Sequence, residues 1–483
     1  MNKSTNNPKP GSNIVRISRL DAIKPINITI NNFDLKKKLY NPSIALLIIY
    51  LAIILIGTTL LLLPQSTNHP DKNSFLISLF TATSSFTLTG LIVENTNEFW
   101  SSFGQAIIVF LIFFGGIGFM TSTSFILKLF GQKISLTQQL LLRESIADPK
   151  SLGKLQTGSA VSNVSLIVSY SIIVQLIIGI LLTLTFTKDM NLYMALWQGV
   201  SQSISSFNGA GFIFFNNEGL LGGYENNSKV IILTGSGIFL GSLGYLVFFD
   251  ILGSLRWKRL SLNTKIVISA TIILNILGTI IFMLLESQPN GLLNNYSMIE
   301  SVKHSIFNTI SGRTAGFSSL PFDSITSSTA IWCATLMFIG GASASTAGGI
   351  KINTIMVVFA FLKSTLTGAS DTSLFGRTIP EDQVRRCLTI TIVGILTILL
   401  CSIIIFQFEQ NTENTNIFFE ICSAFGTVGL SSGFTHISSF GSRIVLTILM
   451  IIGRIGPISL ILILGHINNP RMFKYAQERV TIG

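Results

Sequence analysis

The chain has 483 residues, of which 48% are hydrophobic and only 11% are charged, whereas an average soluble protein carries about 25% charged residues. Too few polar residues remain to coat a water-soluble globule, which argues against a soluble enzyme and for a surface that faces lipid. The net charge of +11 fits either nucleic-acid binding or a membrane protein with basic inner loops. The positions of the charges distinguish these two classes.

The first 40 residues form a polar, basic tail, and no apolar segment of the kind found in a signal peptide occurs before Lys38. Eight apolar segments follow, and most have the roughly 20 residues that a helix needs to cross a bilayer. We expect these segments to span the membrane: 41–63, 103–130, 162–187, 229–254, 264–285, 328–362, 385–407 and 442–466.

The loops between these segments differ in charge. When the segments alternate in direction, most Lys and Arg residues, including Lys36–Lys38 and Arg256–Arg259, fall on the same side as both termini, whereas acidic residues predominate on the other side. Basic loops remain in the cytoplasm. We therefore expect a multi-pass protein of a cell membrane, here a bacterial plasma membrane, with both termini cytoplasmic. The basic charge then needs no nucleic acid to explain it.

The four longer outward connections resemble one another. Each contains a half-apolar stretch that ends in Gly followed by Leu or Phe, at Gly90, Gly211, Gly316 and Gly429. One such turn is more typical of close helix packing, but four copies at similar intervals indicate a repeated functional unit. The sequence thus predicts an all-α polytopic membrane protein with four helix–pore loop–helix repeats and pseudo-fourfold symmetry around one central pore.

The repeats divide the chain into consecutive parts. We expect a cytoplasmic tail at 1–40, repeat 1 at 41–130, a cytoplasmic linker at 131–161, repeat 2 at 162–254, repeat 3 at 255–366, a cytoplasmic linker at 367–383, repeat 4 at 384–467 and a cytoplasmic tail at 468–483.

The four turns have the chemistry of a cation filter. Non-helical backbone cannot face lipid, so the turns must line a cavity walled by protein. A terminal Gly permits positive φ, which lets consecutive carbonyls point towards one axis, and rings of carbonyls replace the water around a dehydrated cation. Four short helices, at about 75–86, 194–206, 299–311 and 415–425, are expected to direct their negative ends at the same point. The predicted filter residues are Thr87, Leu88, Thr89, Gly90, Asn208, Gly209, Ala210, Gly211, Thr314, Ala315, Gly316, Thr427, Val428 and Gly429.

As an ordered set, these turns resemble the filter segments of the Trk/Ktr/HKT superfamily of potassium transporters, and most closely those of its Ktr-type membrane subunits. The segments Gly340–Lys351 and Gly453–Pro457 also agree, so the resemblance covers about residues 41–483. It implies potassium uptake, because sodium-permeating members carry Ser in place of the first filter Gly and this chain carries Gly90. It further implies a homodimer on a cytoplasmic, nucleotide-binding regulatory ring of the KtrA type. No cofactor is expected, potassium is the transported ion, and sodium is a candidate regulator.

A run of small residues interrupts the apolar segment 328–362 and is expected to form a gate. Its members are Gly340, Gly341, Ala342, Ser343, Ala344, Ser345, Thr346, Ala347, Gly348 and Gly349. A kinked helix with tight packing is the alternative. The low helix propensity of the run instead favours a movable loop that blocks ions below the filter, as the Ktr resemblance implies.

Three cationic residues lie in or beside the apolar segments. Arg454 is costly inside a span and is expected either to pair with carbonyls or to hold the loop at 340–349 shut. Lys351 is a second gate residue, unless it extends to the interface. We expect Arg313 to brace the filter from behind, with Glu420 as its partner.

Other functions explain less of the sequence. A sodium- or proton-coupled secondary cation transporter would need a coupling-ion site, usually with a carboxylate inside the membrane, and none is evident. Enzyme motifs are absent from the sequence. We expect Gly235, Gly237 and Gly244 to serve helix packing, and Asp250 to cap a helix or pair in a loop.

Overall fold

The computed structural model describes residues 42–118, 160–215, 220–343 and 345–456, all within the compact unit Pro42–Gly483. Its structure is mostly helical, and strands within these ranges are limited to the short hairpin of β1 (Ser373–Leu374) and β2 (Arg377–Thr378). The expected terminal tails and almost all of the linker 131–161 lie outside the described residues.

Twelve of the helices form four consecutive triplets, each with a short helix in the middle. They are α2 (Pro42–Leu61), α3 (Phe75–Thr87) and α5 (Ser102–Gly116); α8 (Ala160–Phe186), α9 (Leu192–Asn208) and α10 (Ser228–Leu243); α12 (Leu262–Glu286), α13 (Met298–Thr314) and α14 (Ser327–Phe338); and α16 (Glu381–Phe408), α17 (Asn414–Gly426) and α19 (Phe440–Ile455). Each middle helix packs against both helices that flank it in its triplet. All four expected short helices are therefore present, with ends within a few residues of the predicted ones.

Local sequence explains where three of the middle helices begin. The side chains of Ser74 and Asn191 accept hydrogen bonds from backbone N–H groups in the first turns of α3 and α9. Ser297 and Glu300 form a reciprocal capping box at the start of α13. Such caps satisfy N–H groups that have no partner within the helix.

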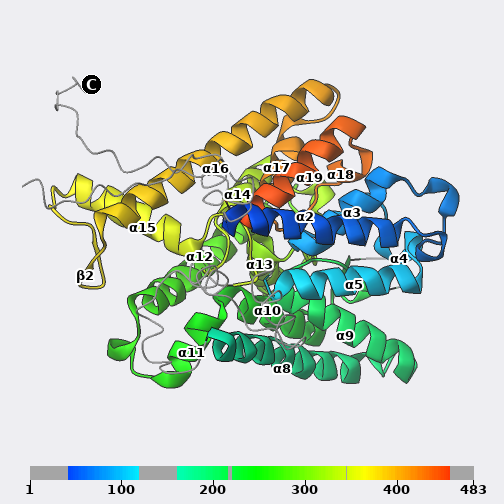
Figure 1. Cartoon of the computed structure of the whole chain (residues 1–483), viewed down its shortest axis with the longest axis horizontal. Helices are drawn as coiled ribbons and strands as arrows, with labels where there is room; N and C mark the ends of the chain where they lie inside the picture. Colours follow the sequence, from blue (N-terminus) through cyan, green and yellow to red (C-terminus); the bar gives the residue numbers. More distant parts are fainter. Residues whose placement is uncertain (1–41, 119–159, 216–219, 344, 457–483) are drawn as a thin grey trace, which may run out of the picture. The chain divides into compact units, whose positions relative to one another are not determined.

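The triplets contact one another in cyclic order, from the first to the fourth and back to the first. The third helix of each triplet packs against the middle helix of the next: α5 against α9, α10 against α13, α14 against α17, and α19 against α3. The last of these pairs joins the two ends of the described chain, and Figure 1 shows α19 beside α3. Every middle helix is thereby enclosed by helices of two triplets.

Not all of the eight expected spans are single unbroken helices, and those expected at 103–130 and 442–466 run beyond the described residues. Among the described residues, three unbroken helices are long and apolar enough to cross a membrane, within α8, α12 and α16. A fourth unit is α10 together with α11 (Tyr245–Gly253), which meet at an angle of 86°. The predicted segment 328–362 is divided into α14 and α15 (Ile352–Leu366).

The bend between α10 and α11 corrects the interpretation of one glycine. Gly244 has φ +77° and ψ +147° and ends α10, so it breaks the span instead of packing within a continuous one. Gly235 and Gly237 do serve packing, because a Cβ at these positions would lie 3.5 Å from Phe307 and 2.7 Å from Ser206 Oγ.

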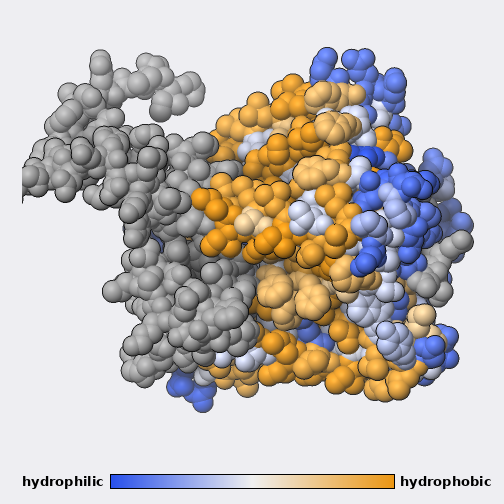
Figure 2. All heavy atoms as spheres, turned by 45° about the vertical axis from the view of Figure 1, so that its right-hand side comes forward, coloured by the Kyte–Doolittle hydropathy of each residue, from blue (hydrophilic) through white to orange (hydrophobic). Residues whose placement is uncertain are grey.

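The outer faces of the long helices are apolar. Ile180 of α8, Ile280 of α12 and Ile403 of α16 expose 60%, 49% and 66% of their surface. Figure 2 shows a broad hydrophobic surface, with hydrophilic residues gathered at one end of the molecule. A protein in water rarely exposes so large an apolar area, whereas a bilayer covers it.

Candidate functional site

A left-handed glycine ends the segment that follows each middle helix. The φ angles are +85° at Gly90, +70° at Gly211, +73° at Gly316 and +92° at Gly429. Three of the segments also begin with a left-handed residue, namely Leu88, Gly209 and Thr427, whereas Ala315 has φ −139°. Leu and Thr adopt this conformation only at an energetic cost, and such strain gathers at functional sites.

Backbone hydrogen bonds close each segment onto the end of its helix. The donors and acceptors are Thr89 N–H to Ser84 O at 2.8 Å, Ala210 N–H to Ser205 O at 2.8 Å, Gly316 N–H to Ser311 O at 3.3 Å, and Val428 N–H to Ser423 O at 2.9 Å. Each bond spans five residues, as in the motif that commonly ends a helix with a left-handed residue. The four segments thus share one backbone hydrogen-bonding pattern. In the third segment the donor is the left-handed glycine itself, whereas in the others it is the residue before that glycine.

The same glycines bring neighbouring segments into direct contact. A Cβ atom on each would come within 2.6 Å of a carbonyl oxygen of the next segment, and these carbonyls belong to Ala210 for Gly90, to Ala315 for Gly211, to Val428 for Gly316 and to Thr89 for Gly429. The contacts run from the first segment through the fourth and back to the first. Only glycine leaves room for this approach.

The closed set of segments is buried and uncharged. Thr89, Ala210, Ala315 and Val428 are fully buried, and none of the four segments carries an ionisable side chain. The backbone therefore supplies most of the polar atoms here. The side-chain oxygens of Asn208, Thr314 and Thr427 add three more, since none of them has a hydrogen-bond partner among the described residues.

The run of small residues between α14 and α15 is a loop. Helix α14 ends at Phe338 and α15 begins at Ile352, so the alternative of a kinked continuous helix is wrong. Gly340 N–H donates to Ile350 O at 2.9 Å and Ile352 N–H donates to Gly341 O at 3.1 Å, which closes the base of the loop. Of its members, Ala344 lies outside the described residues.

This loop contacts the helices that surround the four segments. Ala342 N–H donates to Ser242 O at 3.0 Å, and Gly349 N–H donates to Gly453 O at 3.3 Å. The Thr346 hydroxyl donates to Phe207 O, the last turn of α9, at 3.3 Å.

The loop also reaches the fourth segment itself. A Cβ at Gly348 would overlap the Thr427 hydroxyl, and a Cβ at Gly349 would lie 3.2 Å from Gly426 Cα. The loop therefore lies directly beside the first residue of that segment.

Arg454 and Lys351 both bind carbonyls of this region. Arg454 donates one hydrogen bond to Thr346 O and another to Gly115 O at 2.7 Å, linking α19 to the loop and to the end of α5. Lys351 donates to Ala347 O within the loop itself. Both contacts of Arg454 are with carbonyl oxygens and one of these belongs to the loop, which fits both alternatives expected for this residue. Lys351 turns inward to the loop.

Arg313 has partners other than the expected one. Its guanidinium donates to Asn275 Oδ1 of α12 at 3.2 Å and to Gly340 O at 3.3 Å, so it joins the end of α13 to the base of the loop. The expected partnership with Glu420 is wrong. The Glu420 carboxylate instead accepts hydrogen bonds from Ser431 and Thr435 in its own triplet.

A second repeated motif was missed in the sequence. Gly115, Gly241 and Gly453 lie where α5, α10 and α19 end, and a Cβ on each would overlap the carbonyl of Phe86, Phe207 or Phe425 in the adjacent middle helix. Each is followed three residues later by a glycine with positive φ: Gly118, Gly244 and Gly456. The recurrence of Gly-x-x-Gly 24 to 30 residues after Gly90, Gly211 and Gly429 is the signal that could have revealed it.

No three His, Cys, Asp or Glu side chains in the described ranges converge as metal ligands do. The Asp250 carboxylate accepts a hydrogen bond at 2.9 Å from the N–H of Ser261, and Ser261 is itself the residue that caps α12. Within the described part of the chain, the ionisable residues therefore form no metal-binding cluster.

Known proteins resemble the chain over most of its length. The sequence model of the TrkH family, described as a cation transport protein, matches residues 35–475. The chain is 32% identical over 422 residues to the Ktr system potassium uptake protein B of Bacillus subtilis, covering 87% of this chain and 92% of that protein. It is 32% identical over 442 residues to the potassium/sodium uptake protein NtpJ of Enterococcus hirae, covering 90% and 95%.

A solved structure shares the fold. The crystal structure of the potassium transporter TrkH from Vibrio parahaemolyticus matches with a TM-score of 0.65 at 19% identity, over 88% of this chain and 85% of that one. At this identity the likeness concerns the arrangement of the helices.

Proposed function

Because the chain belongs to the TrkH family of cation transport proteins, we propose that it is the pore-forming subunit of a Ktr-like potassium uptake system in a cell membrane. The observation that carries the proposal is the closed order of four buried segments, in which each glycine faces a backbone carbonyl of the next. The helix triplets are then four helix–pore loop–helix repeats with pseudo-fourfold symmetry around one central pore. The names of relatives such as the Ktr system potassium uptake protein B support potassium as the ion.

Selectivity would come from the backbone of the four segments. Thr87 to Gly90, Asn208 to Gly211, Thr314 to Gly316 and Thr427 to Gly429 form the filter, and their carbonyls replace the hydration shell of a potassium ion. The C-terminal ends of α3, α9, α13 and α17 carry partial negative charge and attract a cation to the same place. This arrangement needs no charged side chain, which agrees with the uncharged composition of the segments.

The loop at 340–349 would act as the gate. It lies beside Thr427 of the fourth segment and is held by Arg454, Lys351 and Arg313 through carbonyl groups. Opening requires those hydrogen bonds to break and the small residues to move aside. The membrane potential then drives inward flow, supplying about 2.3 kcal/mol per charge and 100 mV.

Assembly would follow the Ktr pattern. We place both termini and the basic loops in the cytoplasm, where they form the docking surface for a nucleotide-binding regulatory ring of the KtrA type. Two copies of the chain would form a homodimer with one pore each. Sodium would act as a regulator and not as a coupled substrate. The relatives named as parts of a Ktr system support an assembly with other subunits.

Ion flux into proteoliposomes tests this function. The purified chain should take up potassium when an inside-negative potential is imposed with a proton ionophore and a pH gradient, without any sodium gradient. A sodium- or proton-coupled transporter would instead take up potassium at zero potential when an inward gradient of the coupling ion is supplied. Uptake that needs such a gradient would overturn the pore mechanism and favour the coupled one.

A further inference from the structure

A groove of about 430 Å³ lies on the outer face of the second triplet, between the end of α8 and the start of α10. Its walls are mostly aliphatic and consist of Leu181 and Leu184 of α8 with Ile232 and Leu233 of α10. Leu184 and Ile232 expose 61% and 66% of their surface. These side chains belong to the lipid-facing surface, so the occupant of the groove meets them from the bilayer.

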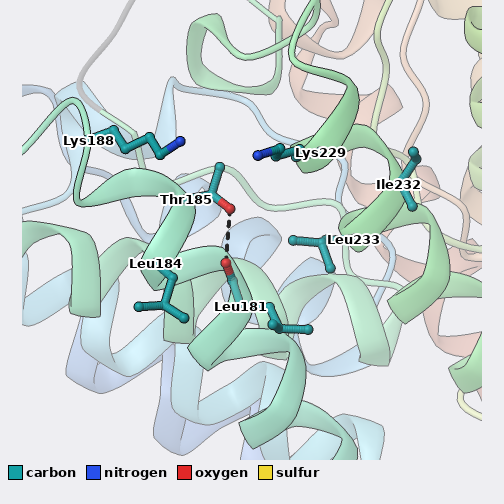
Figure 3. Close-up of a pocket in the computed structure, with 7 residues that line it drawn as sticks. All are labelled: Leu181, Leu184, Thr185, Lys188, Lys229, Ile232 and Leu233. Carbon is teal, nitrogen blue, oxygen red and sulfur yellow. Dashed lines mark hydrogen bonds between the residues drawn. The ribbon is translucent and has the colours of Figure 1, made fainter.

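Two lysines stand at the mouth of the groove. Figure 3 shows the side chains of Lys188 and Lys229 pointing towards one another above the aliphatic walls. Neither lysine is paired with a carboxylate in the described part of the chain. The ion pair found there joins Arg385 to Glu381 instead. The nearest acid in sequence, Asp189, accepts a hydrogen bond from the Tyr224 hydroxyl at 3.1 Å.

Converging like charges repel one another unless an anion lies between them. Thr185, which lies between the lysines and the aliphatic walls, donates its hydroxyl to Leu181 O at 2.9 Å and is satisfied within its own helix. The polar chemistry of the mouth is therefore that of two ammonium groups that lack a protein counterion. Two ammonium groups need a negative charge and hydrogen-bond acceptors between them. A phosphate group supplies both, because it is anionic and accepts several hydrogen bonds.

The two lysines lie at the height along the helices at which a lipid headgroup would lie. Lys188 lies two residues beyond the end of α8 at Phe186, and Lys229 is the second residue of α10. Both lysines thus lie at the boundary of the apolar belt, on the side where α9 begins, while Leu181 and Leu184 extend into the belt. Lysines at such boundaries hold their charges at headgroup level.

We propose that this groove is a binding site for an anionic glycerophospholipid. The phosphate lies between Lys188 and Lys229, and one acyl chain lies along Leu181, Leu184 and Ile232. Helices α8 and α10 both pack against α9. A lipid that bridges the ends of α8 and α10 therefore also stabilises the packing of α9 between them. The inference depends on the membrane location of the chain and is independent of its ion selectivity.

Lipid binding to the full-length purified protein in detergent tests the site. Dioleoyl phosphatidylglycerol should raise the melting temperature of the unchanged chain more than dioleoyl phosphatidylcholine does. Lys188→Gln combined with Lys229→Gln should weaken the apparent affinity for phosphatidylglycerol roughly 30-fold, since each lysine contributes about fivefold to binding an anionic lipid. Lys72→Gln is the matched control, because Lys72 is exposed in the short 3-10 helix Pro70–Lys72 outside the groove, and it should leave the affinity unchanged.

Leu184→Trp provides a second variant that fills the groove and retains both charges. It should also weaken phosphatidylglycerol binding. Inorganic phosphate, tested as a separate ligand, should have little effect on either protein. The proposal is overturned if the double lysine variant binds phosphatidylglycerol like the unchanged chain, or if inorganic phosphate reproduces the full stabilisation.

Discussion

At the residue scale, two properties coincide at the four glycines that we propose to end the filter segments. Each has a positive φ, and each faces a carbonyl oxygen of the next segment with no room for a Cβ. Either property alone is common at a turn, but their combination at Gly90, Gly211, Gly316 and Gly429 ties the geometry of each segment to its neighbour. A side chain at any of these glycines would therefore have to displace a carbonyl of the next segment as well as the backbone of its own segment.

Substituting Gly90 by Ser should raise sodium permeation relative to potassium. The new Cβ would overlap Ala210 O at a backbone angle of φ +85°, so the carbonyls would move from positions that suit potassium. The ratio of rubidium to sodium uptake in cells that lack other potassium uptake systems measures the change. Gly253→Ser is the control, because nothing lies within 4 Å of a Cβ there. An unchanged ratio in Gly90→Ser would contradict the filter assignment.

Substituting Arg454 by Gln should increase ion flux by about tenfold. The change removes the charge-assisted hydrogen bonds to Thr346 O and Gly115 O, each of which is worth about 1.5–3 kcal/mol, so the closed loop loses stability. Flux in proteoliposomes at a fixed potential is the measurement. Arg443→Gln serves as the control in the same helix, since Arg443 bonds to His436 O and Ser438 away from the loop. Flux equal to that of the unchanged chain would show that Arg454 does not hold the gate.

At the scale of elements, the third helix of every triplet stops or bends beside the filter. Helix α5 ends at Gly116, α10 bends into α11 after Gly244, α14 ends at Phe338, and α19 ends at Ile455. The breaks free carbonyls such as those of Gly115 and Gly453, which then accept hydrogen bonds from Arg454 and Gly349. Interrupted helices therefore provide the partners that hold the loop.

Substituting Gly244 by Ala should lower the free energy of unfolding by about 1–3 kcal/mol. The angles φ +77° and ψ +147° belong to a region that glycine adopts almost exclusively, and other residues there carry a strain of that order. Chemical denaturation in detergent, followed by circular dichroism, measures the loss. Gly253→Ala, in the ordinary helical conformation with open space around it, should cost nothing. Equal stability of the two variants would show that the bend can relax.

Deleting residues from within 342–347 should raise potassium flux. The deletion removes Thr346, which accepts the Arg454 hydrogen bond and donates to Phe207 O, and it withdraws the loop from the filter. Flux should increase while the melting temperature stays close to that of the unchanged chain. A deletion variant that folds normally and shows no gain in flux would argue against a gating role.

At the scale of the whole molecule, the closed packing of triplets and the apolar outer surface belong together. A ring of helices that encloses uncharged filter segments leaves its apolar side chains on the outside, where lipid covers them. Among the described residues, the buried charged side chains are those of Lys265, Glu286, Arg313 and Glu420.

Labelling of single cysteines should establish the orientation of the chain. Asn226→Cys, in the loop before α10, should react with a membrane-impermeant maleimide in intact cells, whereas Arg256→Cys should react only after permeabilisation, because basic loops remain in the cytoplasm. The unchanged chain is the control, since Cys333 and Cys422 are buried and Cys387 and Cys401 are half-buried. The reverse labelling pattern would invert the proposed topology.

Much of the fold and of the candidate site follows from local patterns. The four middle helices were predictable because half-apolar stretches specify them, three with capping residues at their starts, and the four glycines because positive φ requires them. Gly244 was misinterpreted because a glycine that breaks a helix and one that packs within it look alike in an apolar segment. Glu420 was assigned to Arg313 on charge alone, whereas its own triplet supplies enough donors to satisfy it.

The sequence by itself determined that this protein has the composition of a membrane protein, that similar glycine-containing turns recur four times along it, and that a run of small residues interrupts one apolar segment. These properties depend on composition, periodicity and backbone freedom, which neighbouring residues set. Only the tertiary structure decided that Arg454 joins Thr346 to Gly115, that Arg313 joins Asn275 to Gly340, and where each third helix breaks. A buried cation must find carbonyl partners wherever packing brings them, and packing here joins residues more than 300 positions apart.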